Sequence, residues 1–187
     1  MSVRWMLLLP IFILFSSCGD DGPEVPSEAT VLSYDGENLN APTFPPGLYE
    51  FAARFPSTLT RELEGQSLTQ VSFFMYDAPA AMYINISTDE TTTVPGPILN
   101  SQRVNNPTPN SWNTITLNTP YLIDGTSLWV GVEVTLDVEQ QSVGCDAGPA
   151  FPNGDWLYDE ENLTWATFTN RTGGAESVNW NIKAIIE

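Results

Sequence analysis

The strict alternation of apolar and polar residues along Ser127–Asp137 constrains the fold of this chain more than any other stretch. Its aliphatic side chains fall on one face of an extended strand and the intervening residues on the other: Leu128, Val130, Val132, Val134 and Leu136 against Trp129, Gly131, Glu133, Thr135 and Asp137. A period of two is typical of a half-buried β-strand. Because no other part of the sequence offers a large apolar surface, we expect a second sheet to cover the apolar face.

Shorter stretches of the same kind predict further strands before and after this one. They cover residues 31–34, 48–55, 68–76, 82–88, 98–104, 112–118 and 178–187, with clusters of Pro, Gly and Asn between them. A single short helix is predicted over residues 57–64, where Ser57 or Thr58 can cap the first turn and Gly65 can end it. Strands at this spacing predict an all-β fold, an antiparallel two-sheet sandwich or jelly roll, over residues 30–187.

The beginning of the chain resembles a bacterial lipoprotein signal peptide, residues 1–17, followed by the lipidated Cys18. Arg4 supplies the positive start, Trp5–Phe15 an apolar run, and Leu14–Cys18 a lipobox-like cleavage site. A plain cleaved signal and a single membrane span are the alternatives. The apolar run has 11 residues, however, and a spanning helix needs roughly 20.

Residues 18–29 are polar, acidic and proline-bearing, which predicts a flexible tether between the lipid and the folded domain. Asp20 and Asp21, directly after Cys18, resemble the surface-export signals of Bacteroidetes lipoproteins. The resemblance implies a protein that a lipid anchors in the bacterial outer membrane, with its domain exposed at the cell surface.

Charge and residue usage exclude several classes of function. The chain has 23 Asp and Glu against 6 Lys and Arg, with a formal net charge of −17. So acidic a surface excludes nucleic acid as a partner, although it supplies carboxylates for a hard cation such as Ca²⁺. There is no histidine, and Cys145 is the one cysteine besides Cys18. Histidine is the usual base that activates a cysteine thiol, so Cys145 is expected to be a small buried residue. Without His and Cys ligands, zinc and haem sites are not expected either.

Several stretches together are similar to a family of accessory modules. They are residues 49–56, 68–79, 124–130, 144–150 and 154–156, with Asn179-Trp180-Asn181-Ile182 near the end. They resemble the β-sandwich modules, galactose-binding-like jelly rolls in outline, of Bacteroidetes surface and secreted proteins of the cleaved-adhesin type. The resemblance implies a non-catalytic binding or adhesion module. An enzyme would have to use carboxylate pairs such as Asp155 with Asp159 or Glu133 with Asp137, and in a chain this acidic such pairs arise by chance.

Residues 158–165 resemble a degenerate Asp-box, a hairpin motif that stabilises a fold and lies away from catalytic residues. Glu160 takes the position of the motif's Asp, Asn162 that of its Gly, and Thr164 and Trp165 match outright. Asn suits the Gly position because it tolerates a positive φ. We therefore expect a β-hairpin here.

Two kinds of site remain open. Jelly rolls of this outline hold a structural Ca²⁺ where their terminal segments meet, and the resemblance implies that Asp35, Asp146, Asp155 and Glu187 are the candidate ligands. The alternative is that these acids cap turns. A ligand site is expected on the loop 144–156 and the outer face of the strand described first, with Trp129, Trp156, Asp146 and Asp155 as its residues. Either Trp could instead pack beneath a loop.

The sequence therefore predicts a surface-tethered binding module that recognises a glycan or a partner protein. The alternative is a structural or assembly component of the cell envelope without a small-molecule ligand. Exposed tryptophans in one concave patch would favour binding, and a broad, flat apolar patch would favour assembly.

Overall fold

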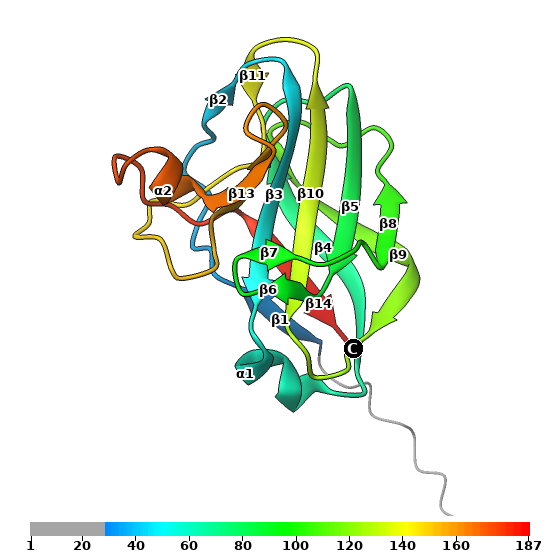
Figure 1. Cartoon of the computed structure of the whole chain (residues 1–187). Coiled ribbons are helices and arrows are strands. Elements are labelled where there is room, and N and C mark those ends of the chain that lie inside the picture. The colour runs from blue at the N-terminus through cyan, green and yellow to red at the C-terminus, as the bar shows by residue number, and fades with distance from the viewer. Residues whose placement is uncertain (1–28) are drawn as a thin grey trace, which may run out of the picture.

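The structure is a computed structural model, and it describes residues 29–187 (Figure 1). The predicted signal, the lipidation site Cys18 and the tether up to residue 28 lie outside the described residues.

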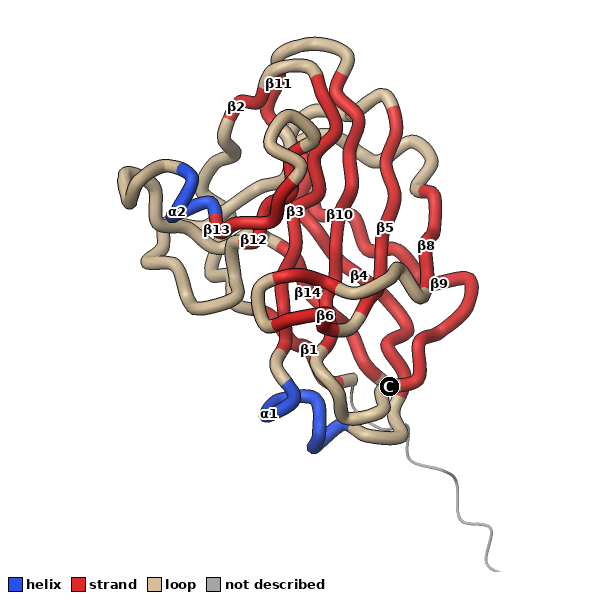
Figure 2. Tube along the Cα trace, in the orientation of Figure 1, coloured by secondary structure: helices blue, strands red, loops and turns tan. Residues whose placement is uncertain are grey.

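Two antiparallel sheets face each other, which confirms the all-β sandwich (Figure 2). The four-stranded sheet has the order β1 (Thr30–Ser33), β14 (Ile182–Ile186), β4 (Ser67–Met75) and β9 (Ser111–Leu122). The six-stranded sheet has the order β13 (Thr164–Thr167), β12 (Trp156–Asp159), β3 (Gly47–Phe55), β10 (Leu128–Leu136), β5 (Ala81–Ser87) and β8 (Asn100–Arg103). Two short ladders join β2 (Thr43–Phe44) to β11 (Gln140–Gln141) and β6 (Asp89–Thr91) to β7 (Val94–Pro95).

The predicted helix is present but shorter and less regular than expected. It is one α-turn, α1 (Ser57–Thr60), followed by a 3₁₀ turn, η1 (Arg61–Leu63). The predicted caps, Ser57 and Thr58, were wrong, because Pro56 is the N-cap residue and no side chain caps the helix. Gly65 follows with a φ of +88° and allows the chain to turn away. A second short helix, α2 (Phe168–Arg171), was not predicted; it begins after Thr167, whose hydroxyl accepts a hydrogen bond from the Asn170 N–H.

The alternating strand is β10, and it lies near the middle of the six-stranded sheet between β3 and β5 (Figure 1). Val132 lies opposite Phe51 on β3 and Ile84 on β5, and all three are fully buried. Together with Phe73 and Trp180 they belong to the core between the sheets. The predicted inward face of β10 is therefore confirmed.

The other face of the six-stranded sheet is only partly covered. The β6–β7 hairpin crosses in front of β3 and β10, and the β12–β13 hairpin extends the sheet beyond β3 (Figure 1). Beneath these two hairpins the outward face is buried at Trp129 and Gly131, whereas Glu133 and Thr135 are half-buried. We call this the outer face, and it carries the candidate site.

Candidate functional site

The floor of the site is a row of polar and aromatic residues that runs across the outer face. Strand register places Trp165, Tyr158, Glu50, Glu133, Tyr83 and Arg103 side by side on six successive strands. Because side chains alternate along a strand, residues paired in this way all point to the same side of the sheet. Local sequence alternation in each strand thus builds one surface from five distant parts of the chain.

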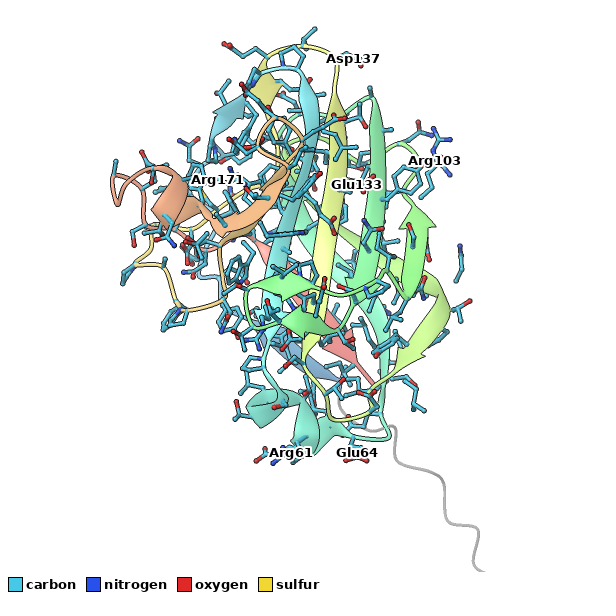
Figure 3. The ribbon with its side chains drawn as sticks, in the orientation of Figure 1. Arg61, Glu64, Arg103, Glu133, Asp137 and Arg171 are labelled. Atoms are coloured by element: carbon cyan, nitrogen blue, oxygen red, sulfur yellow. The ribbon has the colours of Figure 1, made fainter. Side chains whose placement is uncertain are left out.

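Two glutamates face each other at the centre of this row. Glu50 on β3 is the direct partner of Glu133 on β10, and Figure 3 labels Glu133 midway along that strand. The Asn85 side chain donates from Nδ2 to Glu133 Oε2 at 3.2 Å, and Ser101 donates to Asn85 Oδ1 at 2.8 Å. A Cβ at Gly131 would collide with a carboxyl oxygen of Glu50. The missing side chain at Gly131 therefore gives the Glu50 carboxyl its place over β10.

An open cavity of about 180 Å³ lies beside Glu50. Tyr158 and Trp165 form one wall, with ring centroids 5.8 Å apart, and both are half-buried. The segment that follows β6, including Pro95 and Ile98, forms the opposite wall. We call this space the outer-face cavity. It joins two aromatic rings, an apolar wall and one carboxyl group.

Burial and the neighbouring Glu133 raise the pKa of Glu50 to about 7, and a hydrogen bond from Asn85 works against them only in part. The Glu50 carboxyl group is therefore about half protonated near neutral pH. Among residues 29–187 no Lys or Arg forms an ion pair with either carboxyl group. Arg103 lies two strands beyond Glu133, and Arg54 is engaged elsewhere.

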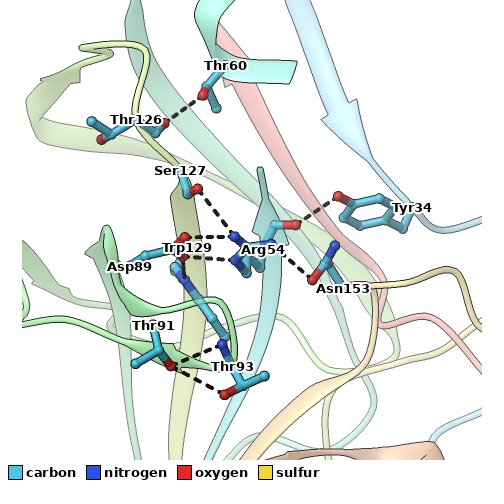
Figure 4. A network of polar contacts seen from close by, with 10 residues as sticks. All are labelled: Tyr34, Arg54, Thr60, Asp89, Thr91, Thr93, Thr126, Ser127, Trp129 and Asn153. Carbon is cyan, nitrogen blue, oxygen red and sulfur yellow. Dashed lines mark hydrogen bonds and ion pairs between the residues drawn. The ribbon is translucent and has the colours of Figure 1, made fainter. Parts of the chain in front are cut away.

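Arg54 belongs to a network that fastens the β6–β7 hairpin onto the sheet (Figure 4). Its guanidinium donates to both carboxylate oxygens of Asp89, at 2.8 and 2.7 Å, and Trp129 Nε1 donates to Asp89 at 2.6 Å. Burial opposes ionisation of Asp89, but the hydrogen bonds from Arg54, Trp129 and Ser127 outweigh it, and its pKa is lowered. The network therefore holds one wall of the outer-face cavity in position.

The two predicted ligand-binding tryptophans lie beneath the surface. Trp129 is 1% exposed and Trp156 is 7% exposed. Their ring centroids are 5.3 Å apart, and Trp165 packs edge-on against Trp129 at 5.5 Å. They are thus packed under the hairpins, as the alternative interpretation held, and Trp165 is the member of the cluster that reaches the cavity. Tyr158 and Trp165 both lie within the Asp-box-like stretch and pair across the hairpin. A hairpin predicted from that likeness could therefore have identified Trp165 as a site residue.

The two predicted acids of the 144–156 loop hold backbone rather than a ligand. Asp146 accepts hydrogen bonds from the N–H groups of Gly36, Gly148 and Asn179 and from the Asn179 side chain, at 2.8–3.0 Å. Burial works against the charge of Asp146, but these donors outweigh it and lower its pKa. Asp155 accepts from the N–H and hydroxyl of Thr169 at the start of α2. Neither carboxylate lines the outer-face cavity.

The four predicted Ca²⁺ ligands do not come together. Among residues 29–187 no three acidic, His or Cys side chains lie close enough to share a metal ion. Asp35 accepts from Asn181 Nδ2 at 3.0 Å and lies 3.6 Å from the Lys183 ammonium. Glu187 is exposed and bonds through its backbone to Ser67.

A different set of oxygens lies around Asn181, however. Asp35 Oδ1, Asn38 Oδ1 and Asn181 Oδ1 are buried without a hydrogen-bond donor. Both asparagine oxygens border the space where a Cβ of Gly144 would be. Burial raises the pKa of Asp35, which the bond from Asn181 and the charge of Lys183 counteract. The N- and C-terminal segments therefore do meet at a group of unpaired acceptors, of which only Asp35 was predicted.

No family model matches the chain, and no curated protein or solved structure matches it. The likeness to accessory modules of the cleaved-adhesin type thus stays a prediction. The part of the chain that the structure describes contains no helix long and apolar enough to cross a membrane.

The hairpin predicted from the Asp-box likeness is confirmed as β12–β13, but its residues are shifted. Asp159, rather than Glu160, accepts from the Asn162 N–H and side chain at 2.9 and 2.7 Å and from Arg171 at 2.8 Å. The residue with positive φ is Leu163, at +52°, rather than Asn162. The roles predicted for Glu160 and Asn162 were therefore wrong, and because the two shifts run in opposite directions, the hairpin does not keep the spacing of the motif.

A larger cavity, about 570 Å³, lies beside Cys145 and Asp146. Asp146 has its donors already, and burial, with the charges of Asp146 and Glu176, raises the pKa of the Cys145 thiol to about 11. A protonated thiol and a saturated carboxylate offer little to a ligand. The outer-face cavity, although smaller, has the titratable group and the aromatic surface.

Proposed function

We propose that this protein is a non-catalytic binding module that holds a carbohydrate in the outer-face cavity. One observation carries the proposal: Trp165 and Tyr158 stand beside the carboxyl group of Glu50 in an open cavity. A pyranose ring has an apolar C–H face, which packs on an aromatic ring, and hydroxyl groups at its rim, which donate to a carboxylate. The cavity offers partners for both.

The size of the cavity favours one sugar unit of a longer glycan. About 180 Å³ corresponds to roughly six water molecules at ~30 Å³ each. The cavity is open, so that neighbouring units of a chain can extend from it along the outer face. Terminal or branching units of surface glycans are therefore the ligands to screen first.

Screening the domain from residue 30 to 187 on a glycan array tests the proposal. Trp165→Ala should weaken binding about 5- to 150-fold, equivalent to about 1–3 kcal/mol, as exposed aromatic anchors do. Trp112→Ala is the control, because Trp112 is a solvent-accessible tryptophan on β9 of the other sheet. An array without binding would overturn the proposal and favour the structural or assembly role instead.

We also propose that the module works at the outer surface of a bacterial outer membrane, tethered through a lipid on Cys18. The lipobox-like sequence before Cys18 and the acidic tether after it support this. Cys18→Ser should move the protein from the membrane fraction to the soluble fraction, and protease treatment of intact cells should remove the wild-type domain. A variant that still needs detergent for extraction would contradict lipidation.

A structural cation at the meeting of the termini is a second, separate proposal. The unpaired oxygens of Asp35, Asn38 and Asn181 support it, since Ca²⁺ prefers carboxylate and amide oxygens. The nearby Lys183 ammonium opposes it. A ligand that binds only the folded state stabilises it, so Ca²⁺ should raise the melting temperature relative to EDTA, and Asp35→Asn should abolish that rise. Equal melting in Ca²⁺ and EDTA would exclude the cation.

A further inference from the structure

The outer-face cavity ends on the carboxyl group of Glu50, and Glu133 lies next to Glu50 on the neighbouring strand β10. Glu50 and Glu133 are direct cross-strand partners, whose Cβ atoms are typically about 4.5–5.5 Å apart. In the described part of the chain neither forms an ion pair, and Asn85 supplies a neutral donor to Glu133. Like charges at this separation in a half-buried place disfavour each other. Such a pair of carboxyl groups favours the binding of a positively charged group.

The walls of the cavity define what kind of cation fits. Pro95 and Ile98 are apolar, and Trp165 and Tyr158 present aromatic rings. A metal ion would seek further oxygen ligands, and no third acidic side chain joins the pair among residues 29–187. An organic ammonium group suits these walls, because it donates three hydrogen bonds and is attracted by aromatic faces.

We propose that the outer-face cavity recognises an ammonium group on its ligand, which makes the carbohydrate an amino sugar whose amine is not acylated. This inference rests on the proposed carbohydrate function and names the class of sugar. The ammonium donates to Glu50, the neighbouring charge of Glu133 adds to the attraction, and the sugar ring packs against Trp165. The excess of negative charge on the whole protein attracts such a ligand as well.

Binding of an ammonium group is linked to a proton. The Glu50 carboxyl group is about half protonated at pH 7 because its pKa is about 7. A bound cation favours the ionised form, so that binding releases this fraction of a proton. Arg103, the Arg54–Asp89 pair and Glu133 are the other charged groups that face this part of the outer face. Affinity should therefore rise about tenfold between pH 5.5 and pH 7, in proportion to the fraction of ionised Glu50.

Calorimetric titration of the domain from residue 30 to 187 with three probes tests the inference. The probes are methyl glucosaminide, its neutral N-acetyl derivative and methyl glucoside, at pH 5.5 and pH 7 in buffers of different ionisation enthalpy. We expect the free amine to bind at least tenfold more tightly than either neutral sugar and to release up to about half a proton at pH 7. Glu50→Gln should remove this preference for the free amine, and Glu133→Gln should weaken it.

Glu139→Gln is the control for net charge, because Glu139 is an exposed carboxylate beyond the end of β10. It should leave all three affinities unchanged. Equal binding of amine and neutral sugars in the wild type would overturn the ammonium inference and leave the carbohydrate function standing. Binding of none of the probes would overturn both. Nα-acetyl-lysine methylamide is a fourth probe, which carries an ammonium group but no sugar. If it binds as tightly as methyl glucosaminide and Glu50→Gln abolishes its binding, the ammonium recognition stands and the choice of a sugar is overturned.

Discussion

Asp89→Ala tests whether the β6–β7 hairpin is held by one carboxylate. The side chain of Asp89 is 24% exposed and that of Arg54 is 8% exposed. Breaking a fully buried pair by removing one partner costs about 3–5 kcal/mol, because the other charge is left unpaired. Water can reach the partly exposed end of this pair, which lowers the expected cost. The indole N–H of Trp129 also loses its acceptor. We expect the free energy of unfolding to fall by about 2–4 kcal/mol.

Urea unfolding of the domain from residue 30 to 187, followed by tryptophan fluorescence, measures this loss. With a slope of about 1–3 kcal/mol per molar urea, the midpoint should fall by about 1 M or more. Glu90→Ala is the matched control in the same hairpin, since Glu90 is exposed, and it should cost under about 0.5 kcal/mol.

The double variant Arg54→Met with Asp89→Ala distinguishes a coupled pair from two independent contacts. Replacing both partners removes the unpaired buried charge, so the double variant should be more stable than Asp89→Ala alone. Our reasoning is refuted if Asp89→Ala lowers the free energy of unfolding no more than Glu90→Ala does. It is also refuted if the loss in the double variant equals the sum of the losses in Asp89→Ala and Arg54→Met alone.

Three further predictions follow from burial and charge. Val132→Asp places a charge in the core and should leave the domain unfolded by circular dichroism, whereas Glu133→Gln on the opposite face should change the free energy of unfolding by under about 0.5 kcal/mol. The folded state binds the Glu50 proton more tightly than the unfolded chain, whose reference pKa is 4.5, so stability falls as pH rises from about 4.5 to about 7. The melting temperature of Glu50→Gln relative to wild type should therefore rise from pH 5 to pH 7 and level off above it, and a constant difference over that range would contradict the raised pKa. The Cys145 thiol, 4% exposed, should react with a thiol reagent at pH 8 only after denaturation, and rapid reaction of the folded domain would show that it is accessible.

Periodicity was sufficient for the sandwich and for the inward face of β10. Val130, Val132 and Val134 are all fully buried, as an alternation of two requires. The short helix was less predictable, because Ser57 and Thr58 match a capping pattern that the actual geometry at Pro56 does not use. Capping depends on the local backbone angles, which the residue types alone do not determine.

The candidate site depended on information that no single stretch contains. Trp129 lies on the polar face of its strand by sequence, yet a hairpin some 40 positions earlier covers it and accepts its N–H through Asp89. Which residue pairs with which is set by strand order and register, and these are global properties of the folded chain.

By itself the sequence therefore determined the class of fold, the strong negative charge and the lack of a His-based chemistry, since these follow from composition and period. Only the tertiary structure brought Glu50 opposite Glu133 and set Tyr158 and Trp165 beside them. Glu50 and Glu133 are 83 positions apart in the sequence, and each alone is an ordinary half-exposed acid on a strand. The raised pKa of Glu50 comes from burial and from its neighbour, and both exist only once the six-stranded sheet has formed.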